Sequence, residues 1–189
     1  SSVTGVQTCA LPISPRVYIA NLMTQPYGTF AAGMMSNDRG TNITDSGAPF
    51  YDAYACADGK FVSLAAVEEK FYAQALKVLG LEHLLATQWD RGSWPAAKTQ
   101  IAQVFATLSR DQWCHAFEGT ESCFAPVLSL DEAPQHPQHV ARGAFVEIDG
   151  VTQPAPAPRF SRTPAGQPTA PASPGADTAQ VLRDWGVEP

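Results

Sequence analysis

Two short runs of alternating apolar residues, separated by a tight-turn signal and followed at once by a helical pattern, constrain the fold of this chain more than any other stretch. The runs cover residues 51–56 and 60–66 and are rich in aromatic and β-branched residues. The Asp-Gly pair at 58–59 predicts a β-hairpin, because glycine accepts the positive φ that a tight turn requires. Residues 68–79 then carry apolar side chains at 3.6-residue spacing, which predicts an amphipathic helix that ends at Gly80. An antiparallel pair of strands must therefore lead directly into a helix.

Glu68 stands where the second run passes into this helix. A glutamate at that position has a simple structural explanation, since a negative charge near a helix N-terminus stabilises the helix by a few tenths to about 1 kcal/mol. Position alone favours this explanation over a catalytic role.

The residues around Glu68 also resemble a known family. Residues 47–72, GAPFYDAYACADGKFVSLAAVEEKFY, are similar to the signature of α-methylacyl-CoA racemases, within the family III CoA-transferase superfamily. In that signature Gly-Ala-Pro-aromatic-Tyr-Asp leads through an Asp-Gly hairpin to Gly-Ala-x-Glu, and Ala65 stands here in place of the last glycine. The resemblance covers roughly residues 36–186. It includes Asp90-Arg91, Trp94-Pro95, Cys123-x-x-Pro126-Val127-Leu128, Arg142-Gly143 and Ala157-Pro158-Arg159-Phe160-Ser161.

The resemblance implies roles for three residues. In the family, the acidic residue that matches Glu68 pairs with a histidine as one acid/base group, and an aspartate serves the opposite side. A tyrosine that matches Tyr51 lies close to the acyl thioester. Asp52 is a third candidate for the substrate site, and the alternative for this strand residue is a hydrogen bond to a nearby turn.

The family's histidine and aspartate come from the N-terminal half of the protein, and nothing before Gly47 matches that half. All four histidines of the chain follow Glu68, in regions that do not match the catalytic histidine. The family's CoA-binding Arg and Lys residues also lie mostly in the N-terminal half. We therefore expect the chain by itself to be inactive.

The family's fold implies an α+β class for this chain, namely the small domain of the family III CoA-transferase fold. We expect a linker helix and loop at 15–46, the small domain at 47–150, and a Pro-rich return segment with a short terminal helix at 151–189. Family members form interlocked homodimers, and each active site lies between the large domain of one subunit and the small domain of the other. We expect an acyl-CoA thioester as substrate and a cytoplasmic location.

Residues 1–14 do not resemble the rest of the chain. They lack the Met start and the charged segment of a targeting peptide. We interpret them as a translated remnant of a sequencing adapter, which leaves Cys9 without a biological role.

The charge of the chain argues against two classes of partner. The net charge is −6 with only 12 Lys and Arg residues, and these form no basic cluster, so neither nucleic acid nor an anionic membrane surface is expected as a partner. Hydrophobic residues make up 44% and charged residues 16%, as in globular proteins. Proton transfer next to a thioester needs no metal or redox group, and we expect no cofactor.

Further elements can be predicted from the pattern. Helices are expected at 94–108 with Ser93 as N-cap and at 109–119 with Ser109 as N-cap. In the second helix Trp113, Ala116 and Phe117 should face inward. A short buried strand is expected at 123–130, with Pro126 marking an edge or a bulge, followed by a second hairpin at 145–153 and a helix at 177–185.

Several reactive or polarizable residues have structural explanations. The apolar pattern of residues 15–35 predicts one bent helix or two helical pieces, with the Met34 and Met35 pair packed in the core. Cys9, Cys56, Cys114 and Cys123 lack metal-like spacing and are interpreted as reduced, mostly buried thiols. His136 and His139 are interpreted as solvated loop residues, because no Cys or carboxylate completes a site.

Three functions remain open: a racemase, a CoA-transferase whose covalent anhydride would form on an aspartate of the N-terminal half, and a non-catalytic interaction module. The Glu68 motif favours the racemase, since transferases of the superfamily usually lack this acidic residue. The observation that separates these functions is whether Glu68 is open to a concave surface or paired with an arginine.

Overall fold

The computed structural model describes residues 27–187. It divides the chain into two compact units, Ser1–Val127 and Leu128–Pro189, here called the first and the second unit. Residues 27–31 are helical. The further elements in chain order are β1 (Tyr51–Ala55), β2 (Phe61–Ala65), α3 (Glu69–Leu79), the 3₁₀ helix η1 (Glu82–Thr87), α4 (Trp94–Phe105), α5 (Arg110–Ala116), β3 (Phe124–Val127), the 3₁₀ helix η2 (Ala133–Gln135), α6 (Pro137–Ala141), β4 (Phe145–Ile148), β5 (Val151–Pro154) and α7 (Thr178–Asp184). This mixture of helices and small antiparallel sheets confirms the α+β class.

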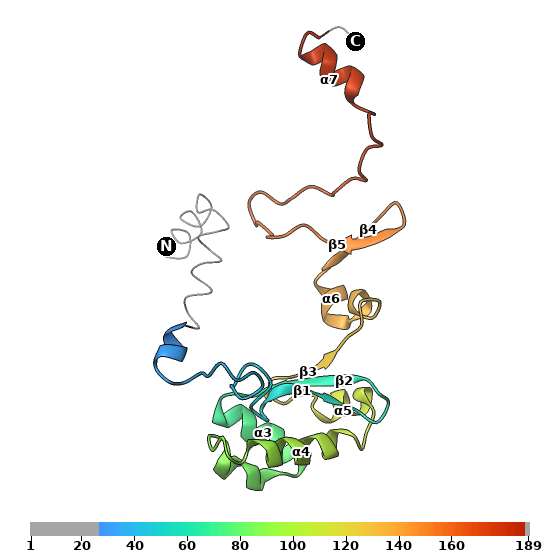
Figure 1. Ribbon diagram of the computed structural model, residues 1–189. Helices are drawn as coiled ribbons and strands as arrows, with labels where there is room; N and C mark the ends of the chain where they lie inside the picture. Colours follow the sequence, from blue (N-terminus) through green and yellow to red (C-terminus); the bar gives the residue numbers. More distant parts are fainter. Residues whose placement is uncertain (1–26, 188–189) are drawn as a thin grey trace. The chain divides into compact units, whose positions relative to one another are not determined.

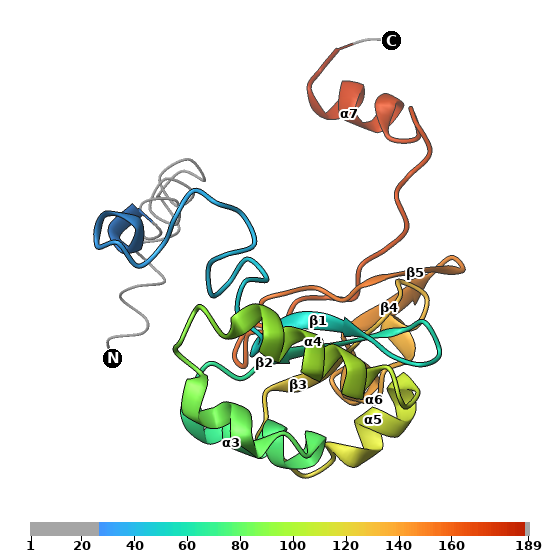
Figure 2. The same ribbon diagram turned by 60° about the horizontal axis from the view of Figure 1, so that its bottom comes forward.

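The first unit contains an antiparallel sheet of three strands in the order β1-β2-β3. The predicted hairpin is confirmed: Gly59 adopts a φ of 75°, and the Cys56 N–H donates to the Lys60 carbonyl oxygen at 2.8 Å. Helices α3, α4 and α5 lie on one face of this sheet (Figures 1 and 2). The register pairs Tyr54 with Val62, so their buried side chains point to this helical face together.

The helix predicted after the hairpin is also confirmed. Glu68 has extended backbone angles and α3 begins at the next residue, while Gly80 ends the helix in the left-handed conformation. The buried side chains of α3 follow the predicted apolar spacing: Tyr72, Ala75, Leu76 and Leu79. One face of α3 therefore packs into the core, and its N-terminus lies at the end of the hairpin.

Two further helices complete the first unit. The predicted helix 94–108 is observed as α4, which ends at Phe105. In α5 the Ser109 hydroxyl accepts the Gln112 N–H, and the Gln112 side chain accepts the Ser109 N–H, which forms a complete capping box. Trp113 and Phe117 are buried as predicted, but the prediction for Ala116 was wrong, because this side chain is exposed. The core layer is filled by the larger aromatic residues, which leaves no need for Ala116 to face it.

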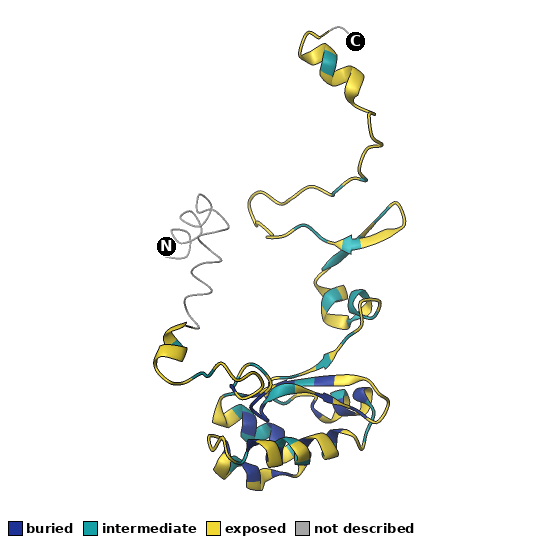
Figure 3. Ribbon diagram, viewed as in Figure 1, coloured by how far each residue is buried: buried dark blue, intermediate teal, exposed yellow. Residues whose placement is uncertain are grey.

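Aromatic side chains dominate the core between the sheet and the helices. Phe50 meets Trp94 edge to face at a centroid distance of 5.8 Å, and Phe105 meets Trp113 in the same way at 5.2 Å. Both phenylalanines are fully buried. Figure 3 shows the buried residues of the first unit gathered between its sheet and its helices. Truncating such a residue to alanine typically costs about 3 to 5 kcal/mol, so these contacts hold the hairpin against the helices.

The strand predicted at 123–130 is shorter and more exposed than expected. Strand β3 has four residues that alternate between half-buried and exposed, so the prediction of a buried strand was wrong. The helices cover only one face of this sheet (Figure 1), so alternate side chains of β3 point away from the core, and its edge position leaves it with a single neighbouring strand. The edge position predicted from Pro126 is confirmed, as proline cannot donate to a further strand.

The second unit contains the second predicted hairpin, β4 paired with β5. Asp149 and Gly150 both have positive φ, at 49° and 77°, as a two-residue type I′ turn requires. Helix α7 confirms the predicted terminal helix, and residues 155–177 between β5 and α7 contain no helix or strand. Among residues 128–187 no side chain is fully buried.

Two predictions concern residues outside the described range. The adapter interpretation of residues 1–14 and most of the bent helix at 15–35 lie there. The predicted domain bounds, 47–150 and 151–189, stay predictions. Within residues 27–187, none of the helices has the length and apolar character that crossing a bilayer demands.

Candidate functional site

Glu68 occupies the junction between β2 and α3 with its carboxylate open to solvent. Its main-chain oxygen accepts the N–H groups of Phe71 and Tyr72, both at 3.0 Å, and so starts the helix. Its side chain makes no capping hydrogen bond, and within residues 27–187 the carboxylate has no ion-pair partner. Glu68 therefore gives α3 no side-chain cap, and the structural explanation that remains is the interaction of its negative charge with the helix N-terminus.

The peptide that precedes Glu68 is held by a buried glutamine. Gln88 follows η1, is 3% exposed, and donates from Nε2 to the Val67 carbonyl oxygen at 2.8 Å. The Gln88 main-chain oxygen accepts the Trp94 indole N–H, also at 2.8 Å. These two bonds tie the strand-to-helix junction to the start of α4.

Tyr51 and Asp52 begin β1 and project to opposite faces of the sheet, because successive strand side chains alternate. Asp52 faces α4 and forms an ion pair with Lys98 at 2.6 Å, and Lys98 also donates to the Ser46 carbonyl oxygen. Its partner is therefore a helix side chain and not the turn that the sequence suggested. Tyr51 is half-buried and lies opposite Ala65 in the ladder. The structure does not bring Tyr51 and Asp52 together.

An apolar hollow of about 690 Å³ lies beside the junction, at Val67. Across it, the Arg91 guanidinium donates to the Met34 carbonyl oxygen at 2.6 Å and lies 5.4 Å from the Trp94 ring. The prediction that Met34 packs in the core was wrong, since its side chain is 58% exposed. The hollow is lined by Thr29, Met34, Met35, Asn42, Ile43, Thr44, Val67, Trp89, Arg91 and Trp94.

The apolar pattern of residues 15–35, from which core packing of Met34 and Met35 was predicted, could not distinguish a core face from the wall of a hollow. The loop that carries them is shaped by polar bonds at Asn42, which donates to Asp45 at 2.7 Å and to the Ser36 carbonyl oxygen at 3.1 Å. The hydrogen bond to Asn42 lowers the pKa of Asp45 below its ordinary value.

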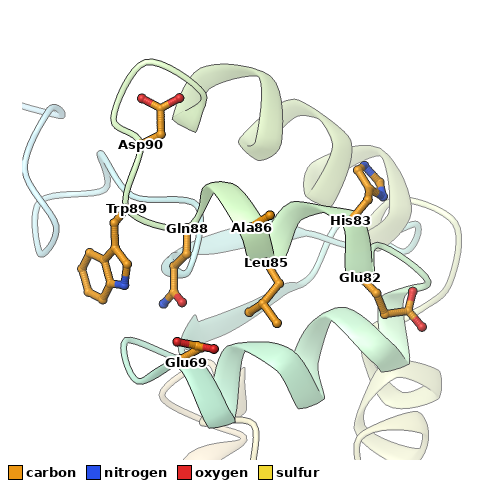
Figure 4. A pocket seen from close by; sticks show the side chains of 8 residues that line it. All are labelled: Glu69, Glu82, His83, Leu85, Ala86, Gln88, Trp89 and Asp90. Atoms are coloured by element: carbon orange, nitrogen blue, oxygen red, sulfur yellow. The ribbon is translucent and has the colours of Figure 1, made fainter.

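A second hollow, of about 600 Å³, lies between η1 and the start of α3 and was not predicted (Figure 4). Its charged lining is acidic, with Glu69, Glu82 and Asp90, and no Lys or Arg contributes to it. His83 lines it too and is hydrogen-bonded to Gln100 at 3.0 Å. Such a surface repels the phosphates of a CoA thioester. In the described part of the chain, no group of three or more His, Cys, Asp or Glu residues is arranged to hold a metal ion.

Two of the cysteine thiols are made less reactive by burial. Cys56, Cys114 and Cys123 carry free thiols, and burial raises the pKa of both Cys56 and Cys114, which disfavours the reactive thiolate. The expectation that most are buried was wrong, since Cys114 is half-buried and Cys123 exposed. His136 accepts the Gln138 N–H, and His139 is hydrogen-bonded to the Ala133 carbonyl oxygen.

Comparison with known proteins finds matches over most of this chain. The family model of CoA-transferase family III matches residues 13–178. The α-methylacyl-CoA racemase of Mus musculus is 44% identical over 168 residues, which cover 86% of this chain and 42% of the mouse protein. The α-methylacyl-CoA racemase of Homo sapiens is 38% identical over 152 residues, which cover 78% of this chain and 40% of the human protein. The chain thus spans about two fifths of the length of these relatives.

The solved structures agree on the fold. The crystal structure of a mutant of Rv3272 from Mycobacterium tuberculosis superposes with a TM-score of 0.57 at 16% identity, and covers 71% of this chain and 40% of that protein. The family resemblance stated from the sequence is confirmed by the family model and by the mouse and human relatives.

Proposed function

The chain belongs to CoA-transferase family III, and from this premise we propose that it is part of an enzyme that epimerises 2-methylacyl-CoA thioesters. Its similarity to the mouse and human racemases supports this reaction within the family. The chain spans about two fifths of their length, and we propose that the activity also requires the counterpart of their remaining part.

The observation that carries the proposal is the open carboxylate of Glu68 at the strand-to-helix junction, which has no partner within the described part of the chain. An acid/base group must reach the proton that it transfers, or reach the group that transfers it. Glu68 meets this requirement and Asp52 does not, since the Asp52 carboxylate is 14% exposed and bound by Lys98.

The chemistry needs two groups on opposite sides of the substrate. One removes the proton next to the thioester carbonyl, the enolate forms, and the other returns a proton to the opposite face. We assign Glu68 to one of these sides, paired with a histidine from the N-terminal part as in the racemases that the sequence resembles. An aspartate of that part serves the other side. Hydrogen-bond donors must be directed at the thioester oxygen, where the negative charge develops.

The surroundings of Glu68 offer a place for the acyl chain. Val67 lines the apolar hollow, whose methionine and tryptophan side chains suit a hydrocarbon group. The acidic hollow beside Glu69 is unsuited to the phosphates of CoA, so the nucleotide end must lie elsewhere. We place Tyr51 near the thioester with less support, because it lies opposite Ala65 and makes no contact that identifies a ligand.

The test uses two proteins: the 189-residue chain alone, and a completed protein in which the N-terminal part of the mouse racemase precedes it. We expect α-proton exchange of a 2-methylacyl-CoA in deuterated water from the completed protein and none from the chain alone. Glu68→Gln in the completed protein should lower kcat by about 100-fold or more. Glu69→Gln is the matched control and should leave kcat unchanged.

Three results would overturn the proposal. They are exchange by the chain alone, no exchange by the completed protein, or equal kcat for the two glutamine variants. Transfer of CoA to a free carboxylate without α-proton exchange would instead support the transferase.

We also propose that the completed protein forms an interlocked homodimer, because the chain belongs to this family. Analytical ultracentrifugation of the completed protein tests this proposal.

A further inference from the structure

Gln88 is a buried polar residue whose side chain is hydrogen-bonded to the backbone next to Glu68. Its side-chain amide donates to Val67, the residue directly before Glu68, and its main-chain oxygen is fixed by the Trp94 indole. No other hydrogen bond to the Val67 carbonyl oxygen occurs within residues 27–187. The strand ladder has ended by then, and the first helical bond of α3 is accepted by Glu68. Gln88 therefore supplies a hydrogen bond that neither β2 nor α3 can supply.

The oxygen atom of the Gln88 side-chain amide lowers the stability of the folded protein. Its Oε1 is buried and has no hydrogen-bond partner, which destabilises a folded protein. Turning the amide over would place Oε1 against the Val67 carbonyl oxygen, and two acceptors cannot bond. Only the Nε2 bond to Val67 accounts for an amide at this buried position.

The Val67 carbonyl belongs to the same peptide plane as the Glu68 N–H. Glu68 has φ −75° and ψ 136°, and its side chain has no bond of its own that would fix its direction within the described chain. Within the described residues, the backbone therefore fixes only the Cα–Cβ bond of Glu68, from which the side chain extends. That backbone is held on one side by Gln88 and on the other by the first turn of α3.

We propose that Gln88 is a positioning residue: its amide fixes the Val67–Glu68 peptide, and so fixes the place from which the Glu68 side chain reaches its partner. This inference rests on the proposed role of Glu68. Gln88 touches neither the substrate nor the reacting atoms, so its effect must appear in kcat and not in KM.

The kinetic arm uses Gln88→Leu and Gln88→Glu in the completed protein. Q88L keeps the volume but loses the donor, and we expect kcat to fall by about 10- to 100-fold with KM unchanged. In Q88E the introduced carboxyl can donate to Val67 only while protonated. Its kcat should therefore approach that of the parent at low pH and fall as this group ionises, which a purely structural role would not produce.

Leu84→Ala is the matched control. Leu84 is a buried residue of η1, 7% exposed, without a hydrogen bond to the junction. L84A should lower stability and leave kcat of the folded protein unchanged. A kcat of Q88L equal to that of the parent, or the same response in L84A, would overturn the inference.

A second arm is independent of activity and uses the 189-residue chain. The Phe71 and Tyr72 amides donate to the Glu68 oxygen, so their hydrogen exchange reports on the junction. We expect Q88L to speed the exchange of these two amides at least tenfold more than that of amides near Leu79. In L84A the exchange rates at the two ends of α3 should change by similar factors. Should the completed protein show no α-proton exchange at all, the proposed function fails, and this arm alone decides whether Gln88 positions Glu68. Unchanged exchange at both amides would then refute the inference.

Discussion

At the scale of single residues, neighbouring carboxylates have different environments in this chain. Glu68 precedes α3 and has no ion-pair partner among residues 27–187, whereas Glu69, in the first turn, lines the acidic hollow with Glu82. Asp52 is neutralised by Lys98, which joins β1 to α4. The sequence motif contains Asp52, Glu68 and Glu69, but only the fold determines which of these carboxylates stays available for proton transfer.

Buried tyrosines lead to a prediction of how the stability of the protein depends on pH. Burial raises the pKa of Tyr72 to about 12, above its ordinary value of 10.0. The folded state thus favours the neutral phenol, and this contribution to stability is fully present below pH 10 and is lost as the pH rises toward 12. We expect the free energy of unfolding to fall over this range. Tyr72→Phe should reduce that fall by on the order of 2 kcal/mol in urea titrations at each pH.

A second buried tyrosine extends this experiment. Burial also raises the pKa of Tyr54, so Tyr54→Phe should likewise reduce the loss of stability at alkaline pH. A parent and a Y72F variant with identical profiles above pH 10 would refute the prediction.

At the scale of elements, the sequence pattern predicted turns and helix ends, which depend on residues close together in the chain. The hairpin turn at Gly59, the helix end at Gly80 and the N-cap at Ser109 all follow from preferences of residues within a few positions of one another. Exposure could not be predicted in the same way. Cys123 and Met34 fit buried patterns, but the edge position of β3 and the apolar hollow leave their side chains accessible.

In the candidate site, too, the sequence predicted one part and missed another. The motif identified Glu68, but Gln88 and the acidic hollow come from η1, twenty residues later, and their contact with the junction depends on how η1 folds back over α3. A buried glutamine next to a tryptophan-led helix carries no signal in a single sequence.

The two N-cap serines make a matched test of helix capping. The Ser109 hydroxyl accepts the Gln112 N–H, so Ser109→Ala should lower the free energy of unfolding by about 1 kcal/mol. The Ser93 hydroxyl makes no cap bond and instead donates to the carbonyl oxygens of Thr87 and Asp90. Ser93→Ala should therefore cost less than about 0.5 kcal/mol, within the range of ordinary surface changes. Urea unfolding followed by the fluorescence of the buried Trp113 measures both, and an equal cost for the two variants would contradict this account.

At the scale of the whole molecule, the two units differ in how much they bury. The fully buried side chains of residues 27–187 all lie between Asn42 and Ser122, in the first unit. The second unit exposes Leu130 at 94% and Trp185 at 81%. Burial of apolar surface is the main source of folding free energy, so the first unit holds most of the stability of the chain.

Hydrogen exchange at single amides would test this difference directly. Strand β2 is the central strand of its sheet and carries the buried Val62 and Leu64, so its amides should exchange only when the first unit unfolds. The hairpin of β4 and β5 has two strands and no buried residue, and such hairpins are marginally stable in water. Helix α7 has seven residues, too few to be stable without a packed face. We therefore expect amides of β4, β5 and α7 to exchange at least about 100-fold faster than those of β2 in the 189-residue chain. Equal protection in the two units would mean that the second unit gains its stability from contacts beyond its own buried surface.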